Sequence, residues 1–283
     1  MISKSRISYC GYFMLISVIV TTFNRPKALN LVLQALDKQT DKNFEVIVAD
    51  DGSKSETKDS IDNLRKRVNY NLVHVWQEDN GFRAALVRNK AVLSSRGEYI
   101  LFLDGDCIPP ISWIARHRRL AEKGWMVAGN RILLSKNFTK KIEDNNESIY
   151  QWNLMKWMLC SYERLVNRWS PMLYLPLGVL RKIGSRKWEK VRTCNLGVWR
   201  EDFFCVNGFD SLFEGWGFED SDLAVRLINS GVKRKLGSCA SGVIHLWHAE
   251  FDRSRSKNNN QILIERIKNN IKESTIGLRQ LTP

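Results

Sequence analysis

The sequence has no long apolar run. A membrane-spanning helix needs roughly 18 consecutive apolar residues, and the longest N-terminal candidate, Tyr12–Val20, is shorter and leads straight into polar residues. No small-residue cleavage site follows that run, so a signal peptide is not predicted either. Six cysteines are scattered over the chain and no two of them form a CxxC pair, which argues against a zinc site or a disulfide framework. These absences favour a protein of the reducing cytosol.

Two nucleotide-binding signatures are also missing. The apolar segment LISVIVT (residues 15–21) is followed by TFNRP, and not by the GxGxxG turn expected of a nicotinamide-dependent dehydrogenase. It is not followed by a glycine-rich, lysine-containing loop of the kind that sugar nucleotidyltransferases use. Both of these enzyme classes are therefore disfavoured.

Acidic residues are outnumbered. The chain has 30 Asp and Glu against 44 Lys and Arg, which gives a net charge of +14. This balance implies an anionic partner, such as nucleotide phosphate, nucleic acid or an acidic membrane. A non-enzymatic nucleic-acid-binding protein would leave unexplained six carboxylates that phosphate backbones repel: Asp50, Asp51, Asp104, Asp106, Glu219 and Asp220. We therefore expect no nucleic-acid partner.

The first hundred residues alternate between strand-like and helix-like segments. Strands are predicted at 15–21, 44–49, 72–76 and 99–103, and helices from Pro26 and at 55–67 and 83–95. This alternation predicts an α/β protein with a Rossmann-like, mostly parallel central sheet flanked by helices. A smaller mixed region follows, with short strands at 125–128 and 131–134. The predicted parts are an optional N-terminal extension (1–13), an α/β half (14–129), a second half of the same domain (130–250) and a basic C-terminal tail or helix (251–283).

Polar side chains follow the buried strand that ends at Leu103. Asp104 and Asp106 flank a glycine at the carboxyl end of a parallel strand, where open α/β sheets bind ligands. Carboxylates suit Mg²⁺ or Mn²⁺, which substrate phosphates commonly share. Arg83 and Arg88 lie near the first turns of a predicted helix, where arginines and a helix N-terminus would favour phosphate. Taken alone, Asp-Gly is equally consistent with a simple turn.

Residues 214–222 (EGWGFEDSD) combine a tight loop with a cluster of acids. Two glycines enclose Trp216, whose flat apolar face matches a sugar ring. Glu219, Asp220 and Asp222 then open a helix, where carboxylates are favoured by the helix dipole. Helix capping explains one or two of these acids, but it does not explain a tryptophan between two glycines.

The last predicted strand, at 242–248, carries His245 and His248. Side chains alternate along a strand, so these two residues should lie on opposite faces. At most one of them is therefore expected to point into the ligand crevice, where Asp104 and Asp106 are expected to bind a metal ion.

Residues 150–169 are predicted to form one amphipathic helix. Its apolar stripe consists of Met155, Met158, Leu159, Tyr162, Leu165 and Trp169. The longer stretch 150–192 contains nine Lys and Arg against two Glu, a composition that can lie on an anionic membrane surface. Packing of the stripe on the domain is the other interpretation, and the residues alone leave both open.

Several motifs together carry a resemblance to a known family. SVIVTTFNRP, NFEVIVADDGS, the RN of LVRNKAV and ILFLDGD resemble, in this order, family 2 glycosyltransferases of the GT-A fold. The segment CNLGVWREDFFCVNGFDSLFEGWGFEDSDLAVRL resembles a galactosyltransferase-type carboxyl region, which has a Gly-Trp-Gly-x-Glu-Asp motif. CASGVIHLW resembles the strand that bears a metal-ligating histidine in related transferases. Residues 130–190 match no motif of this family, so no residue roles can be transferred to them.

The resemblance assigns roles to individual residues. The donor nucleotide would contact Thr22, Asn24, Arg25, Asp51, Arg83 and Asp104. The metal ion, Mn²⁺ or Mg²⁺, would be held by Asp106 and His245, with Asp104 and His248 as further candidates. Trp216 and Glu219 would bind the acceptor, and Asp220 would be the general base.

The resemblance thus implies a metal-dependent inverting glycosyltransferase that moves a sugar from a UDP-sugar to a saccharide or lipid-linked acceptor in bacterial surface polysaccharide (lipopolysaccharide or capsule) synthesis. Residues 14–129 would bind the nucleotide sugar, and residues 130–250 would form the acceptor and catalytic half. A retaining GT-A transferase is an alternative, but those enzymes have Glu-Asn where this chain has Glu219-Asp220. A basic nucleic-acid-binding protein is the other alternative. The expected location is the cytoplasm, including the inner face of the inner membrane.

Overall fold

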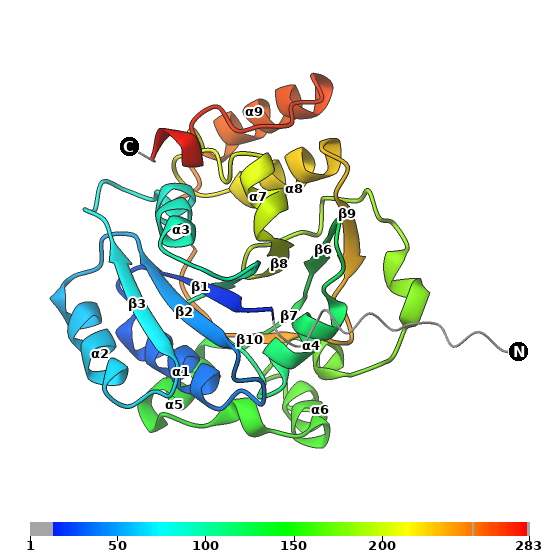
Figure 1. Ribbon diagram of the computed structural model, residues 1–283. Coiled ribbons are helices and arrows are strands. Elements are labelled where there is room, and N and C mark those ends of the chain that lie inside the picture. Colours follow the sequence, from blue (N-terminus) through cyan, green and yellow to red (C-terminus); the bar gives the residue numbers. More distant parts are fainter. Residues whose placement is uncertain (1–13, 251, 282–283) are drawn as a thin grey trace, which may run out of the picture.

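A twisted sheet runs through the centre of the computed structural model (Figure 1), which describes residues 14–250 and 252–281. The extension predicted at 1–13 lies outside the described residues. Within the described chain the sheet has seven strands, and only β8 runs against the others. In spatial order the strands are β3 (Asn71–Trp76), β2 (Phe44–Asp50), β1 (Ile16–Thr22), β4 (Tyr99–Asp104), β8 (Asn195–Trp199), β6 (Trp125–Ala128) and β9 (Lys233–Leu236). The predicted α/β class with a mostly parallel sheet is confirmed.

Helices cover both faces of the sheet and bury it in two apolar layers. Successive side chains of a strand point to opposite faces, so β1 gives Val18 and Val20 to one layer and Ile19 to the other. The first layer contains α1 (Pro26–Asp37) and α2 (Ser55–Arg65), and the second contains α3 (Ala84–Leu93), α7 (Arg200–Cys205) and α8 (Glu219–Asn229). The strands and helices predicted between residues 15 and 103 agree with the structure to within two residues at each end.

The register of three neighbouring strands brings the predicted donor residues together. β1 lies between β2 and β4, with Thr22 paired to Asp50 and Thr21 paired to Asp104. The carboxyl ends of the three strands therefore meet at one edge of the sheet, which is where α/β folds place their ligands.

A second sheet of three short strands lies beside this edge. It consists of β5 (Cys107–Ile108), β10 (Val243–His245) and β7 (Arg131–Leu133). His245 is paired with Cys107, the residue that follows Asp106. The strand predicted at 242–248 ends at His245, so His248 does not follow the alternation of a strand.

The single helix predicted at 150–169 is wrong. The segment forms a 3-10 turn η2 (Ile149–Gln151) and a short helix α6 (Leu154–Tyr162), and the chain then turns at Arg164, which has a φ of 55°. Both faces of α6 are apolar. The face that is buried in the core contains Trp157 and, one turn further on, Cys160. Four residues of the predicted stripe consequently face away from the core: Met155, Met158, Leu159 and Tyr162 are 46–86% exposed.

The C-terminal segment predicted as a basic tail or helix contains a helix and is packed against the domain. α9 (Ser256–Lys268) contacts α8, and η5 (Leu278–Gln280) lies near α3. Buried Asp210 fixes this segment by accepting hydrogen bonds from the backbone of Thr275 at 2.7 Å and from the side chain of Arg266 at 2.6 Å.

The remaining helices are α4 (Trp113–Leu120), α5 (Lys136–Asn145), η3 (Ser170–Met172) and η4 (Gly178–Lys182). Of these, η3 contacts β7 of the second sheet, and η4 contacts β9 of the central sheet. Among the described residues, no helix has the length and apolar character needed to cross a bilayer.

Candidate active site

A cleft of about 550 Å³ opens at the carboxyl edge of the central sheet. It is lined by the turns after β1 and β4, the first residues of α8 and the segment after β10. Ten of the twelve predicted site residues line it: Thr22, Arg25, Asp51, Asp104, Asp106, Trp216, Glu219, Asp220, His245 and His248. Residues far apart in the sequence are thus brought into one cavity.

Asn24 and Arg83 are the two predicted site residues that do not line the cleft. Asn24 has a left-handed backbone (φ 49°), and its side-chain oxygen accepts a hydrogen bond from the backbone N–H of Lys54 at 2.9 Å. Arg83 turns its guanidinium to the carbonyl of Glu78, and its backbone N–H donates to Asp51 Oδ2 at 2.7 Å. Both residues hold the loops that shape the cleft.

Asp51 lies at the buried end of the donor region. Its carboxylate accepts hydrogen bonds from Gln77 Nε2 at 2.6 Å and from the Arg83 backbone. Burial raises the pKa of Asp51, while these two hydrogen bonds oppose the rise. Thr22 lines the cleft, and its buried Oγ1 atom has no hydrogen-bond partner among the described residues.

Arg88 joins the donor and acceptor parts of the site. Its guanidinium contacts Glu219 Oε1 at 3.2 Å and Asp104 Oδ1 at 3.3 Å, and it donates to Thr21 Oγ1 at 3.0 Å. The sequence predicted that Arg88 would favour phosphate, but in the structure its guanidinium contacts the carboxylates of Glu219 and Asp104. The sequence indicates an unusual role for Arg88, because a charged residue lies on the same face of α3 as the buried residues Ala84 and Ala91.

Glu219 is a buried acid of the cleft with a strongly raised pKa. Burial, reinforced by the neighbouring charge of Asp220, raises its pKa to about 7, although Arg88 opposes this rise. Its Oε2 atom has no hydrogen-bond partner among the described residues. An acid in this state takes up or releases a proton close to neutral pH.

We expect Glu219 to make the stability of the protein depend on pH. A folded-state pKa of about 7 lies above the ordinary value of 4.5, so the contribution is full below about pH 4.5 and is lost as the pH rises through 7. The loss should be on the order of 3 kcal/mol. In chemical denaturation, Glu219→Gln should flatten the fall in unfolding free energy between about pH 4.5 and pH 7. An unchanged slope in the variant would contradict this assignment.

Asp220 follows Glu219 in the first turn of α8. Phe218, the residue before Glu219, has a left-handed backbone (φ 73°), which directs the chain from the loop into the helix. Asp220 Oδ2 accepts a hydrogen bond of 3.4 Å from the backbone N–H of Thr193, and its side chain lines the cleft. This carboxylate is held in place and open to a ligand.

Asp106 and two histidines form the candidate metal site. His245 Nε2 lies 3.7 Å from Asp106 Oδ1, and His248 Nε2 lies 3.6 Å from Asp106 Oδ2. The prediction that at most one histidine faces the crevice is wrong, because β10 ends at His245 and the chain then turns. Burial lowers the pKa of His245 to about 4, so its imidazole is neutral at pH 7, as a metal ligand must be.

The donor atoms at Asp106 fit a divalent cation. Carboxylate oxygen and imidazole nitrogen atoms are both common ligands of divalent metal ions. Arg25 Nη1 now contacts Asp106 Oδ2 at 2.9 Å, and Arg25 Nη2 contacts Glu143 Oε1 at 2.9 Å. A positive charge therefore already compensates the Asp106 carboxylate.

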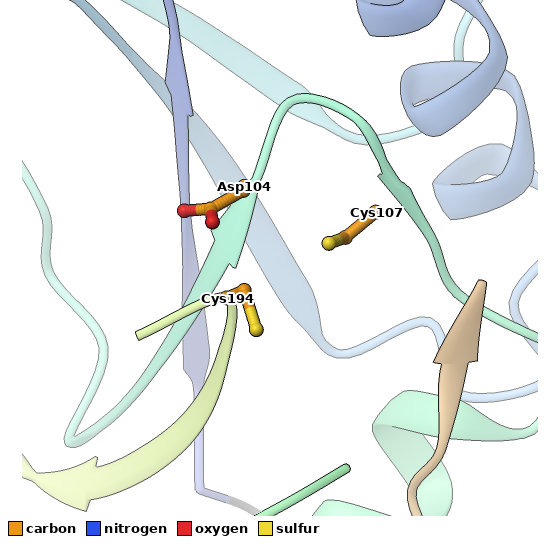
Figure 2. A group of neighbouring side chains, drawn as sticks. All are labelled: Asp104, Cys107 and Cys194. Atoms are coloured by element: carbon orange, nitrogen blue, oxygen red, sulfur yellow. The ribbon is translucent and has the colours of Figure 1, made fainter. Parts of the chain in front are cut away.

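A second group of candidate ligands, Asp104, Cys107 and Cys194, fits a cation less well. Figure 2 shows the three side chains close together, and their ligand atoms lie within 4.8 Å of one another. Burial raises the pKa of the Cys107 thiol well above its usual value, which disfavours the thiolate that a metal requires. The guanidinium of Arg131, 3.2 Å from Cys194 Sγ, would also repel a cation.

The loop that carries Trp216 is fixed by the C-terminal helix. Asn259 on α9 is buried, and its Nδ2 donates to the carbonyls of Glu214 at 3.1 Å and Gly217 at 3.0 Å. The guanidinium of Arg253 lies over the Trp216 ring at 4.7 Å. Nothing local in the sequence indicates these contacts, because the partners are about 40 residues apart.

We expect Asn259→Ala to loosen this loop. The substitution leaves two carbonyls without their donor, which typically costs about 1–3 kcal/mol. Amide hydrogen exchange over residues 214–218 should become roughly 5- to 100-fold faster, while UDP binding should be unchanged. Asn258→Ala, at the exposed neighbouring position, is the matched control. Equal exchange in both variants would show that Asn259 does not hold the loop.

Comparison with known proteins identifies the family. The model described as "Glycosyl transferase family 2" matches residues 17–174, more than half of the chain. The chain belongs to glycosyl transferase family 2. A further model, described as "N-terminal domain of galactosyltransferase", matches residues 182–272. Both parts of the predicted resemblance are confirmed.

Several curated relatives of this family 2 glycosyltransferase are synthases and transferases of sugars. Chondroitin synthase of Pasteurella multocida is 26% identical over 230 residues, which cover 76% of this chain and 23% of the relative. Validoxylamine A glucosyltransferase of Streptomyces hygroscopicus is 26% identical over 275 residues, with 88% and 59% covered. A glucosyltransferase of Campylobacter jejuni named for an undecaprenol-linked acceptor is 32% identical over 143 residues, with 47% and 45% covered. The chain thus spans less than two thirds of each of these relatives.

Solved structures share the fold of this family 2 glycosyltransferase. S. aureus TarS 1-349 in complex with UDP-GlcNAc has a TM-score of 0.60 at 17% identity, covering 94% of this chain and 69% of that one. GalNAc-T7 with UDP, GalNAc and Mn²⁺ has a TM-score of 0.61 at 18% identity, covering 89% and 48%. At these identities the similarity shows the fold, and it confirms the predicted GT-A architecture.

Proposed function

We propose that this family 2 glycosyltransferase is a metal-dependent inverting enzyme that moves a sugar from a UDP-sugar to a saccharide or lipid-linked saccharide acceptor. One observation carries the proposal. A single cleft contains a carboxylate–imidazole cluster, formed by Asp106, His245 and His248, and also a pair of acids at a helix start, Glu219 and Asp220.

The donor part of the cleft has groups for a nucleotide and a cation. The hydroxyl of Thr22 and the buried carboxylate of Asp51 would bind the uridine, and Asp104 would lie near the ribose. Asp106 and His245 would hold the cation, with His248 beside them. When bound, a divalent cation supplies positive charge to the departing diphosphate. The UDP of the TarS and GalNAc-T7 structures, and the Mn²⁺ of the latter, support this choice of donor and cofactor.

The acceptor part would supply the base. An acceptor hydroxyl must lose its proton as its oxygen attacks the anomeric carbon, and a carboxylate within hydrogen-bond reach can take that proton. Asp220 would do so, while Glu219, held by Arg88, orients the acceptor next to the stacking surface of Trp216. The C1–O bond to the diphosphate breaks as the new bond forms, so the configuration at the anomeric carbon inverts.

The proposed setting is bacterial surface polysaccharide synthesis at the cytoplasmic face of the inner membrane. The names of the chondroitin synthase and of the undecaprenol-linked glucosyltransferase support acceptors of this kind. The net charge of +14 would favour an acidic membrane surface.

A panel of UDP-sugars tests the proposal. The protein would be incubated with each sugar nucleotide in the presence of Mn²⁺, Mg²⁺ or EDTA, and the UDP released by hydrolysis would be measured. We expect release from at least one UDP-sugar with a metal ion and none with EDTA. If the protein released nucleotide only from GDP-sugars, the proposed UDP-sugar donor would be contradicted. Salt-sensitive DNA binding without sugar-nucleotide binding would favour the nucleic-acid alternative.

A further inference from the structure

A second cavity of about 390 Å³ lies outside the catalytic cleft and shares no lining residue with it. It is enclosed by the C-terminal end of α4, the segment 174–182 and the edge strand β9. We call it the basic pocket, since its lining contains five cations and one acid: Arg116, Arg119, Arg181, Lys182, Lys235 and Glu122. The charge of this lining is strongly positive.

Hydrogen bonds hold the wall of the basic pocket in place. Arg181 is buried, and its guanidinium donates to the carbonyls of Leu236 at 3.0 Å, Ser238 at 2.7 Å and Cys239 at 3.1 Å. It therefore fastens the segment 174–182 to the chain that follows β9. Arg181 belongs to the stretch predicted to meet a membrane, but its charge is directed inward.

The other cations of the lining outnumber its single acid. Glu122 is shared between Lys182 Nζ at 2.7 Å and Lys235 Nζ at 2.6 Å, so one negative charge faces two positive charges. Arg119 is exposed and forms no ion pair within the described part of the chain. An anion in the basic pocket would compensate this excess of positive charge.

The segment that forms one wall of the basic pocket also has exposed apolar side chains. Val179 is 79% exposed, Leu180 is 55% exposed and Ile183 is 63% exposed. Aliphatic side chains in water are costly when they gather on one short segment. A soluble phosphate or nucleotide would leave them exposed, whereas a lipid would supply an anionic headgroup for the pocket and an apolar phase for these side chains.

We propose that the basic pocket binds the phosphate headgroup of an anionic phospholipid and that the aliphatic side chains of 179–183 enter the membrane interface. The inference deepens the proposed membrane location by naming the surface and its ligand. Its test measures vesicle binding and does not require sugar transfer, so failure of either proposal can be recognised separately.

Co-sedimentation with vesicles tests this site. The unmodified protein should bind phosphatidylcholine vesicles that contain phosphatidylglycerol, in a salt-sensitive manner, and should bind pure phosphatidylcholine much more weakly. The double variant Arg119→Gln/Lys182→Gln should lose about 25-fold in affinity, since each basic residue near an anionic surface contributes about 5-fold. The variant Val179→Ser/Leu180→Ser should weaken the binding that persists at high salt. Metal-dependent UDP release in solution should be unchanged in both variants.

A matched control separates the pocket from net charge. Lys58→Gln/Arg67→Gln removes the same charge from exposed positions in and just after α2, which lies near β3 at the edge of the sheet opposite β9 (Figure 1). This control should lose less than about 3-fold. Equal losses in the two double variants would mean that net charge alone draws the protein to membranes and would overturn the proposal. Loss of binding only in Met155→Ser/Tyr162→Ser would also overturn it, because α6 would then be the docking face.

Discussion

Asp220→Asn should slow sugar transfer by about 10²–10⁴-fold, the usual effect of losing a general base. The amide keeps the size of the side chain and can still accept a hydrogen bond from Thr193, but it cannot take the proton of the acceptor hydroxyl. The affinity for UDP in the presence of Mn²⁺ should barely change, because the proposed donor site consists of other residues. Transfer rates and calorimetric UDP affinities would be measured on the same preparation.

A matched control makes the result for Asp220 decisive. Asp59→Asn introduces the same change at an exposed position of α2 and should leave the rate unchanged. If Asp220→Asn transfers sugar at a near-normal rate, the base lies elsewhere, and Glu219 becomes the next candidate. If it abolishes UDP binding, Asp220 belongs to the donor site and the proposed division of roles is wrong.

Asp106→Ala should lower metal-dependent UDP release by roughly 10²–10³-fold, which corresponds to several kcal/mol of charge stabilisation. The variant removes the carboxylate that lies within 4 Å of both histidine Nε2 atoms. His245→Ala should act in the same direction and loosen the nucleotide and the metal together. UDP affinity with Mn²⁺ and with EDTA would be compared for each variant.

The control for Asp106 lies on α5. Asp144→Ala also removes a carboxylate, one that is half exposed and paired with Lys27, and it should leave the metal dependence intact. A normal difference between Mn²⁺ and EDTA in Asp106→Ala would place the cation on other ligands, of which Asp104 is the first candidate.

The sequence was most informative where local patterns suffice. Apolar runs such as 99–103, the turn residues after them and the proline at the start of α1 predict strands, loops and a helix from short-range properties alone. The parallel register then follows from the βαβ units. Together these features predicted the edge of the sheet at which ten of the twelve candidate residues meet.

Contacts between distant segments were not predictable in this way. The carboxylate partners of Arg88, the capping of the Trp216 loop by Asn259 and the turn that brings His248 to Asp106 depend on tertiary packing. The orientation of α6 was also decided by packing, because both sides of that helix are apolar and only one could be buried. Periodicity alone cannot choose between two such faces.

The most direct test of this account is a calorimetric titration of the unmodified protein with UDP, once with Mn²⁺ and once with EDTA. The proposed site at Asp106 and His245 predicts distinctly tighter binding with Mn²⁺, because the cation would be shared between these ligands and the diphosphate. The same affinity under both conditions would contradict the metal-dependent donor site on which the proposed mechanism depends.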